Sequence, residues 1–238
     1  MTLPSDFATV APHTQNHKHK LQMRTKALLL TAAVGAVGIA SSMAQAVYSV
    51  NIVGYVNKTL PSGLSMVANQ LNATPNNRVT TLIPTPTGAL SVSKFVPATG
   101  NFVSATFDTD AGWDDPTSMV LNPGQGAFVD NPNPPMPVTF VGEVQLNSTV
   151  NIHSGLDIYS SVLPQAGDLN AIGFPAIPSG QQMALFKFNG TAFSNFSYDE
   201  EAGGWQPAIP TVAIGESFFI DNGANPTLPW TRNFTVGP

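Results

Sequence analysis

The chain has 238 residues, with 9 Lys and Arg against 14 Asp and Glu, and a formal net charge of −5 at pH 7. Beyond residue 46 the basic residues are only Lys58, Arg78, Lys94, Lys187 and Arg232, so the acidic balance argues against nucleic acid or an anionic membrane surface as a partner. The sequence contains no cysteine, which excludes disulfides, thiolate catalysis and zinc–thiolate sites.

Residues 23–46, MRTKALLLTAAVGAVGIASSMAQA, have the pattern of a secretory signal peptide. The apolar run Ala27–Ala40 follows a basic start and ends before a small-residue cleavage site. This run is shorter than the roughly 20 residues that span a bilayer. We therefore expect a secreted, extracellular or periplasmic protein that is cleaved after Ala46 and then has no transmembrane segment. Residues 1–22 are expected to be a non-native upstream extension ahead of a true start at Met23.

The segment 47–60 begins with VYSVNIVGYV, an uncharged run typical of a strong β-strand. No clear counterpart of it precedes the second half of the chain. The strand is expected to pair within its own sheet. The alternative is donation to the open sheet edge of a second copy, for which the candidate residues are Val47, Tyr48, Val50 and Ile52.

The remainder of the chain contains two degenerate copies of one unit. Phe107, Trp113, Gly124 and Phe128 return as Tyr198, Trp205, Gly215 and Phe219, displaced by 91 or 92 positions. A fixed period of this kind indicates a repeated structural unit. We expect the first repeat to occupy residues 61–145 and the second to occupy residues 146–238.

Each repeat contains short alternating segments that are separated by Pro- and Gly-rich turns. This pattern predicts an all-β fold, with two similar small β-sandwich or partly open barrel modules in tandem. Helical structure is expected only as short turns near residues 78–83 and 168–172. Phe102 and Phe107 lie five positions apart on one predicted strand, so a β-bulge is expected to restore the apolar face there and at the equivalent place in the second copy.

An acidic cluster surrounds the first Ala-Gly turn and contains Asp108, Asp110, Asp114 and Asp115. Carboxylates around a glycine turn can ligate Ca²⁺. The cluster does not fit an EF-hand loop, because the residue at the twelfth position is Met119. A calcium site and a solvated turn both stay open as interpretations, and no other cofactor is expected.

Trp113, Trp205 and Tyr198 are the candidates for a carbohydrate-binding platform, because aromatic rings present flat apolar faces. The alternative is that each tryptophan closes the end of its module as a structural plug. His153 is the only histidine beyond residue 46 and has no counterpart in the first repeat, so no catalytic residue is assigned and no enzymatic activity is expected.

The chain resembles a group of secreted bacterial tandem-repeat β-proteins to which no activity is assigned. The resemblance rests on the VYSVNIVGYV start, the SGLSMVANQLN opening and the two series KF…FD…GW…PGQGAFV and KF…YD…GGW…GESFFI. It implies export, tandem β-modules and a cell-surface or extracellular setting, and it supplies no site residues.

Three functions are therefore compared. The leading hypothesis is an exported, non-enzymatic structural or adhesive protein of the bacterial cell surface or exterior, whose partner is a second copy of itself or a cell-surface glycan. The first alternative is a carbohydrate-binding module, and the second is a glycoside hydrolase that uses two carboxylates.

Overall fold

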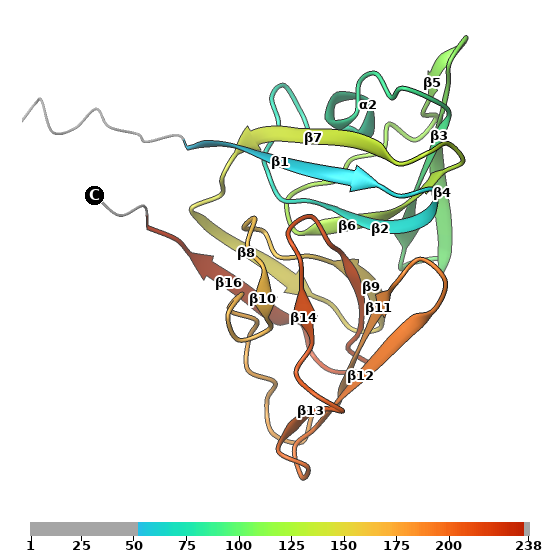
Figure 1. The fold of residues 1–238 in the computed structure, drawn as a ribbon. Coiled ribbons are helices and arrows are strands. Elements are labelled where there is room, and N and C mark those ends of the chain that lie inside the picture. The colour runs from blue at the N-terminus through green and yellow to red at the C-terminus, as the bar shows by residue number, and fades with distance from the viewer. Residues whose placement is uncertain (1–51, 236–238) are drawn as a thin grey trace, which may run out of the picture. The chain divides into compact units, whose positions relative to one another are not determined.

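A computed structural model describes residues 52–235, so the predicted signal peptide and the 1–22 extension lie outside the described residues. The first repeat comprises β1 (Val53–Leu60), β2 (Gly63–Asn69), the helical turn α2 (Val79–Leu82), β3 (Leu90–Val96), β4 (Asn101–Asp108), β5 (Gly112–Asp114), β6 (Gln125–Asn131) and β7 (Met136–Glu143). The second comprises β8 (Asn147–Ile152), β9 (Leu156–Tyr159), β10 (Gly167–Asp168), β11 (Met183–Phe188), β12 (Phe193–Asp199), β13 (Gly204–Gln206), β14 (Thr211–Val212), β15 (Phe218–Asp221) and β16 (Leu228–Asn233). The predicted all-β fold is confirmed (Figure 1).

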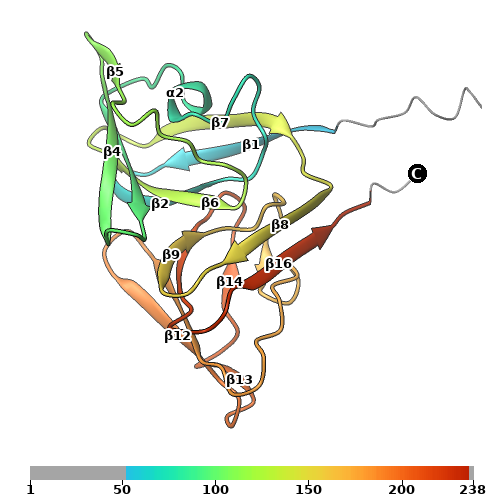
Figure 2. The same cartoon turned by 180° about the vertical axis from the view of Figure 1, so that it is seen from behind.

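Each repeat combines a larger and a smaller antiparallel sheet. The larger sheets have the strand orders β2-β6-β3-β4-β5 and β9-β15-β11-β12-β13, and a bridge between Gln125 and Tyr159 joins them into one ten-stranded sheet. The smaller sheets pair the first and last strands of each repeat, β1 with β7 and β8 with β16 (Figures 1 and 2). The second repeat adds the short pair β10–β14. None of the helices in residues 52–235 is long and apolar enough to cross a membrane.

The first strand has a counterpart in the second repeat, contrary to the expectation from the sequence. Leu60 of β1 lies opposite Met136, and Ile152 of β8 lies opposite Leu228, so the two pairs occupy the same place in their repeats. All four side chains are buried. The equivalence could not be recognised from the sequence of β8, NSTVNI, because four of its six residues are polar. Residues 47–51 of the predicted strand lie outside the described residues.

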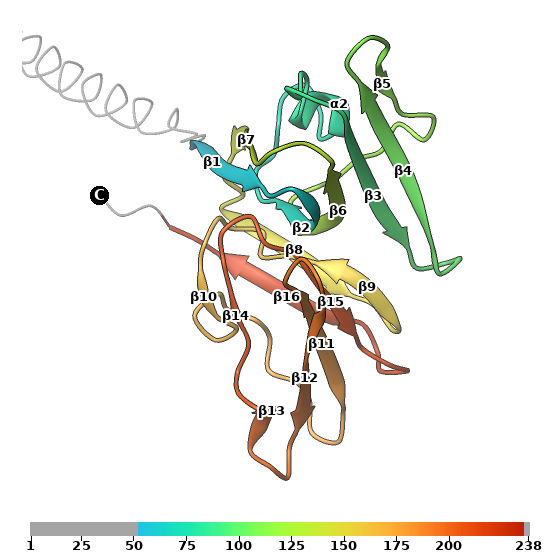
Figure 3. The same ribbon diagram turned by 45° about the vertical axis from the view of Figure 1, so that its right-hand side comes forward.

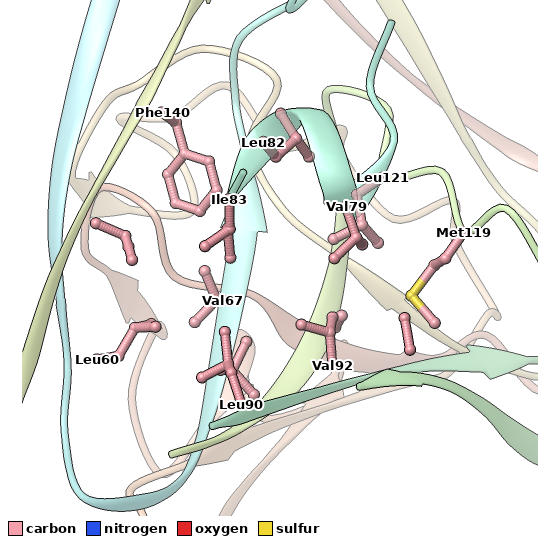
Figure 4. Packing of buried hydrophobic residues seen from close by; sticks show 14 of the residues in the cluster. Leu60, Val67, Val79, Leu82, Ile83, Leu90, Val92, Met119, Leu121 and Phe140 are labelled. Carbon is pink, nitrogen blue, oxygen red and sulfur yellow. The ribbon is translucent and has the colours of Figure 1, made fainter. Parts of the chain in front are cut away.

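Both sheets of a repeat contribute to its own hydrophobic core. In the first repeat, side chains from β1, β2, β3 and β7 meet below α2, among them Leu60, Val67, Val92 and Phe140 (Figure 4). In the second repeat, β8, β11, β15 and β16 supply Ile152, Leu185, Phe218 and Trp230, which are at most 1% exposed. A helix forms only in the first copy, whereas in the second copy residues 169–173 form a turn with one helical-type bond, from the amide of Ile172 to the carbonyl of Asp168 at 3.1 Å.

A buried asparagine fixes the end of β6 and, in the same way, the end of β15. Asn131 and Asn222 are both 0% exposed. The side-chain Nδ2 of Asn131 donates to the carbonyl of Pro134 at 3.1 Å, and that of Asn222 donates to the carbonyl of Pro226 at 3.1 Å. Each Nδ2 also donates to the carbonyl of the last residue of the repeat's first strand. The repeated asparagines therefore have a structural role.

The two repeats contact each other through reciprocal backbone hydrogen bonds. The amide of Ser160 donates to the carbonyl of Gly124 at 2.9 Å, and the amide of Ala68 donates to the carbonyl of Gly215 at 3.1 Å. Ala68 and Ser160 are equivalent residues, and so are Gly124 and Gly215. Each repeat thus makes the same bond to the other, which is the pattern of an isologous interface around a twofold axis. Here that pattern occurs within one chain.

An aromatic cluster accompanies this junction. The equivalent rings of Phe128 and Phe219 have centroids 6.0 Å apart. Phe95 contacts Phe219 at 5.6 Å, and Phe188 contacts Phe128 at 5.6 Å, both edge to face. Such pairs contribute about 0.5–1.5 kcal/mol beyond their buried area. The junction is therefore an apolar interface as well as a hydrogen-bonded one.

The same aromatic cluster explains why the apolar residues Phe102 and Phe107 lie on opposite faces of β4. The expected bulge does not form, because β3 and β4 pair without a break from Leu90–Phe107 to Val96–Asn101 (Figure 3). Phe107 packs against the core of its own repeat, whereas Phe102 lies on the other face of the strand and contacts Phe128 at 5.7 Å. The pairing of β11 with β12 is equally continuous. Both faces of the β3–β4 hairpin thus carry aromatic contacts, and Phe102 stays 46% exposed.

Steric contact at the junction explains why one copy of the turn ends in glycine and the other in serine. Gly126 and Ser217 are equivalent residues and face each other, so that a Cβ added at Gly126 would lie 2.2 Å from the Cβ of Ser217. The buried Ser217 donates its hydroxyl to the carbonyl of Val67 at 3.1 Å. Only one of the two positions can carry a side chain in this packing.

Candidate functional site

The two repeated tryptophans occupy matching positions at the end of each larger sheet. Trp113 of β5 lies opposite Phe107 of β4, and Trp205 of β13 lies opposite Tyr198 of β12. The ring centroids are 5.5 Å apart in the first pair and 5.8 Å apart in the second, and both pairs are edge to face. The structure therefore brings Trp205 and Tyr198 together and leaves Trp113 in the other repeat.

The fold uses both the ring and the N–H of Trp113. Its indole Nε1 donates to the carbonyl of Ile83 at 2.9 Å. Its half-buried ring packs against the core of the first repeat. These contacts are those of a structural plug.

Trp205 has a different environment. Its ring lies edge to face with Phe174 at 6.3 Å, and Phe174 in turn packs on the buried Trp230 at 5.1 Å. The Nε1 of Trp205 has no hydrogen-bond acceptor among residues 52–235, in contrast to that of Trp113. The ring of Trp205 is half-buried and its N–H is available to a ligand.

Trp205 and Tyr198 line a cavity of about 530 Å³, together with Phe174, Pro175 and residues of the neighbouring loops. Small-ligand sites commonly have volumes of roughly 300–1,000 Å³. The turn residues Gly203 and Gly204 border the cavity with φ angles of +83° and +130°, which favour glycine. A Cβ at either position would meet no atom within 4 Å, so the cavity is open on this side.

Polar groups on the cavity wall add to its aromatic rings. Tyr198 contributes a hydroxyl that Phe107 lacks in the first repeat, and the exposed Asn170 contributes an amide. Neither side chain has a hydrogen-bond partner in the described part of the chain. With the indole N–H of Trp205, these groups supply both donors and acceptors next to an apolar surface.

The turn beside the cavity is acidic and is held in place by hydrogen bonds. The carboxylate of Glu200 accepts the amide N–H of Gly180 at 2.8 Å and the hydroxyl of Ser179 at 2.7 Å. These bonds, the backbone one first, lower the pKa of the Glu200 carboxyl. Glu200 is therefore ionised at neutral pH, and it belongs to the same turn as Gly203 of the cavity wall.

The acidic turns of the two repeats contain the same pair of hydrogen bonds between an aspartate side chain and two backbone amides. Oδ1 of Asp108 accepts the amide N–H groups of Asp110 at 2.8 Å and Ala111 at 3.0 Å. These two bonds lower the pKa of Asp108. Asp199 accepts the two equivalent bonds in the second repeat. In both copies the aspartate shapes a turn of the kind that Asx side chains favour.

The other predicted calcium ligands do not converge with Asp108. Asp110 and Asp114 are exposed, and Oδ1 of Asp115 accepts the amide N–H of Met119 at 2.8 Å. Across residues 52–235, no group of three or more His, Cys, Asp or Glu side chains is arranged to hold a metal ion.

A second cavity, of about 500 Å³, lies at the junction of the repeats and was not found from the sequence. Lys94 and Asp157 line it from different repeats. Burial lowers the pKa of Lys94 and raises the pKa of Asp157, and the charge of each partly opposes the shift of the other. The sequence feature that could have indicated this cavity is the difference between the repeats at Asp157, because the equivalent residue of the first repeat is Ser65.

Lys94 itself has a structural role. Its Nζ donates to the carbonyl of Val120 at 2.7 Å and to Oε1 of Gln125 at 3.0 Å. Lys187 makes the equivalent contacts in the second repeat, with the carbonyl of Thr211 and, at 3.1 Å, with Glu216. The repeated Lys-Phe dipeptide thus anchors the loop that precedes β6 or β15.

Three of the residues predicted for self-association, Val47, Tyr48 and Val50, lie outside the described residues. Ile52 is half-buried, and its carbonyl accepts the amide N–H of Val144 at 2.8 Å. The described part of this segment is therefore bonded to its own repeat.

Comparisons of the chain with protein-family models, curated proteins and solved structures find no match. The resemblance to secreted tandem-repeat β-proteins accordingly stays a prediction.

Proposed function

We propose that the protein is an exported, non-enzymatic adhesive protein whose second repeat binds carbohydrate in the cavity lined by Phe174, Tyr198 and Trp205. The observation that carries the proposal is the contrast between the two tryptophans. Trp113 donates its indole N–H to the carbonyl of Ile83, whereas Trp205 borders an open cavity with its N–H unused among the described residues.

The chemistry of the cavity suits a sugar ring. A sugar has an apolar face of C–H groups, which an aromatic ring can cover, and hydroxyls that both donate and accept hydrogen bonds. The cavity pairs aromatic rings with the hydroxyl of Tyr198, the amide of Asn170 and the N–H of Trp205. The wall of the cavity therefore combines aromatic rings with polar groups, and both kinds of contact occur in ligand sites.

Glycan-array binding followed by calorimetry tests this proposal. Trp205→Ala is expected to abolish binding, because it removes the central ring. Tyr198→Phe is expected to weaken binding without loss of stability, since the first repeat folds with Phe107 at the equivalent position. Trp113→Ala is the matched control, and it should lower stability while leaving the affinity of the folded protein unchanged.

Two results would contradict the proposal. One is a folded Trp205→Ala variant that binds glycans as tightly as the unaltered chain, and the other is loss of binding in a folded Trp113→Ala variant. Turnover of a glycan by the unaltered chain would favour the glycoside-hydrolase alternative instead.

Self-association is a second candidate function, favoured by an exposed apolar face on the β1–β7 sheet. Tyr55 and Val141 lie opposite each other and are 73% and 54% exposed. The equivalent pair in the second repeat is Asn147 and Asn233, which are polar. Within residues 52–235, β1 has no strand partner except β7, so its other edge can pair with β1 of a second copy.

The double variant Tyr55→Asn and Val141→Asn tests this candidate by giving the first repeat the residues of the second. Light scattering over a range of concentrations is expected to show oligomers of the unaltered chain and monomers of the variant. A chain that is monomeric at every concentration would refute self-association and would leave the carbohydrate proposal untouched.

A further inference from the structure

We infer that the Tyr198–Trp205 cavity recognises a single terminal sugar residue that is uncharged, rather than the interior of a polysaccharide or an acidic sugar. This inference rests on the proposed carbohydrate binding and adds the class of ligand.

The orientation of the aromatic rings favours a single sugar residue. The planes of Tyr198 and Trp205 meet at 74°, and those of Phe174 and Trp205 meet at 71°. A chain of sugars that stacks along a platform needs aromatic faces that are close to coplanar. With nearly perpendicular neighbours, one ring can lie under a sugar while the others form walls around it. The cavity therefore encloses one residue, which must be an end of the glycan.

The charges around the cavity favour a neutral sugar. Neither a basic nor an acidic side chain lines the described cavity. The adjacent turn carries Asp199, Glu200 and Glu201, and the hydrogen bonds from Gly180 and Ser179 keep Glu200 ionised. At physiological ionic strength, charges interact over about 8 Å. A uronate or another anionic sugar placed in the cavity would be repelled by this turn and would find no cation on its wall.

The polar contacts agree with a neutral ligand. Asn170, the Tyr198 hydroxyl and the Trp205 N–H form hydrogen bonds without carrying charge. The open side at Gly203 and Gly204 leaves room for the rest of the glycan to leave the cavity toward solvent.

Calorimetric titration of the full chain tests the inference with three sets of glycans. The first set is linear oligosaccharides with neutral ends, the second is cyclic oligosaccharides of the same sugar and linkage, and the third is oligosaccharides that end in a uronic acid. We expect the cyclic and uronate-terminated forms to bind at least tenfold more weakly than the linear neutral form. If the cyclic form binds as tightly as the linear neutral form, the cavity does not recognise an end of the glycan. If the uronate-terminated form binds as tightly as the linear neutral form, the cavity has no preference for neutral sugars.

A charge variant provides a separate readout. Glu201→Gln removes one exposed carboxylate from the turn. It is expected to reduce the difference in affinity (the affinity gap) between uronate-terminated and neutral glycans. Asp110→Asn, at the equivalent position of the first repeat, is the matched control and should leave the gap unchanged. An unchanged gap in Glu201→Gln would overturn the electrostatic argument. If no glycan of any set binds, the proposed function itself fails, whereas binding with the wrong selectivity refutes only this inference.

Discussion

Exchanging the side chains at positions 126 and 217 tests the pseudo-twofold junction between the repeats. In Gly126→Ser the new Cβ would lie 2.2 Å from the Cβ of Ser217, 2.4 Å from its Oγ and 2.8 Å from Cγ2 of Ile158. Overpacking of this kind typically lowers the free energy of unfolding by about 1–3 kcal/mol. For a chain of this size, that corresponds to a fall in Tm of up to about 10 °C.

The second single variant, Ser217→Gly, loses the hydrogen bond to the carbonyl of Val67 and places a glycine, with its larger backbone entropy in the unfolded chain, directly before β15. Together these changes cost about 1.5–2 kcal/mol. The double variant Gly126→Ser with Ser217→Gly restores one serine and one glycine on opposite sides of the junction. We expect it to be within about 1 kcal/mol of the unaltered chain, so the two changes should be strongly non-additive.

Urea unfolding followed by tryptophan fluorescence measures this double-mutant cycle. The account requires the double variant to be more stable than Gly126→Ser alone. Simple addition of the two single effects would show that the residues do not face each other, and it would refute the reciprocal packing of the repeats.

Three further predictions concern stability. Asn131→Ala and Asn222→Ala should each lower the free energy of unfolding by about 1–3 kcal/mol, and by similar amounts, because each removes a buried side-chain donor to the last carbonyl of the repeat's first strand and to a proline carbonyl. A large difference between the two variants in denaturant unfolding would contradict their equivalence. Ile152→Ala should cost about 2–5 kcal/mol, as Leu60→Ala does, if β8 is the counterpart of β1; a negligible effect of Ile152→Ala in the same assay would argue against it. Burial raises the pKa of Asp157, so this group's contribution to the free energy of unfolding is complete below the unfolded pKa of 3.8 and is lost as pH rises through the folded pKa. Asp157→Ser should therefore gain stability relative to the unaltered chain as pH rises through this interval, when unfolding is followed from pH 3 to pH 7. The opposite trend would refute the raised pKa of Asp157.

The strand content and the repeats could be predicted because they depend on local patterns. Alternating apolar residues and Pro/Gly turns mark most strands of both copies, and the equivalents of Trp113 and Gly124 stand at a nearly fixed spacing. The strand β8 was missed because only Val150 and Ile152 of its six residues are apolar. Its place is determined by pairing with β16, which lies far along the chain.

The bulge prediction was wrong because of the aromatic cluster at the junction of the repeats. Phe102 was interpreted as evidence for a bulge because a strand was assumed to have a single apolar face. The second face is apolar because Phe102 packs on Phe95 and Phe128 of its own repeat, and both of these rings contact Phe219 of the other repeat. Contacts of this kind connect residues that no local pattern relates.

The candidate site was predictable in part. Trp205 and Tyr198 were identified from the repeat, and cross-strand pairing brings them together. The sequence could not distinguish Trp205 from Trp113, because the distinction depends on the carbonyl of Ile83, which is 30 residues away. Asn170 and Phe174 belong to the loop that corresponds to residues 78–83 of the first repeat, but their side chains differ from those of the first copy, so the repeat pattern did not mark them as site residues.

The indole N–H signals in a nitrogen–proton correlation spectrum test the central claim most directly. The chain has three tryptophans, and each gives one such signal. During titration with a neutral oligosaccharide, the account predicts that the signal of Trp205 moves, while those of Trp113, bonded to Ile83, and the buried Trp230 stay in place. A spectrum in which Trp113 moves and Trp205 does not, or in which no indole signal moves with any glycan, would contradict the account.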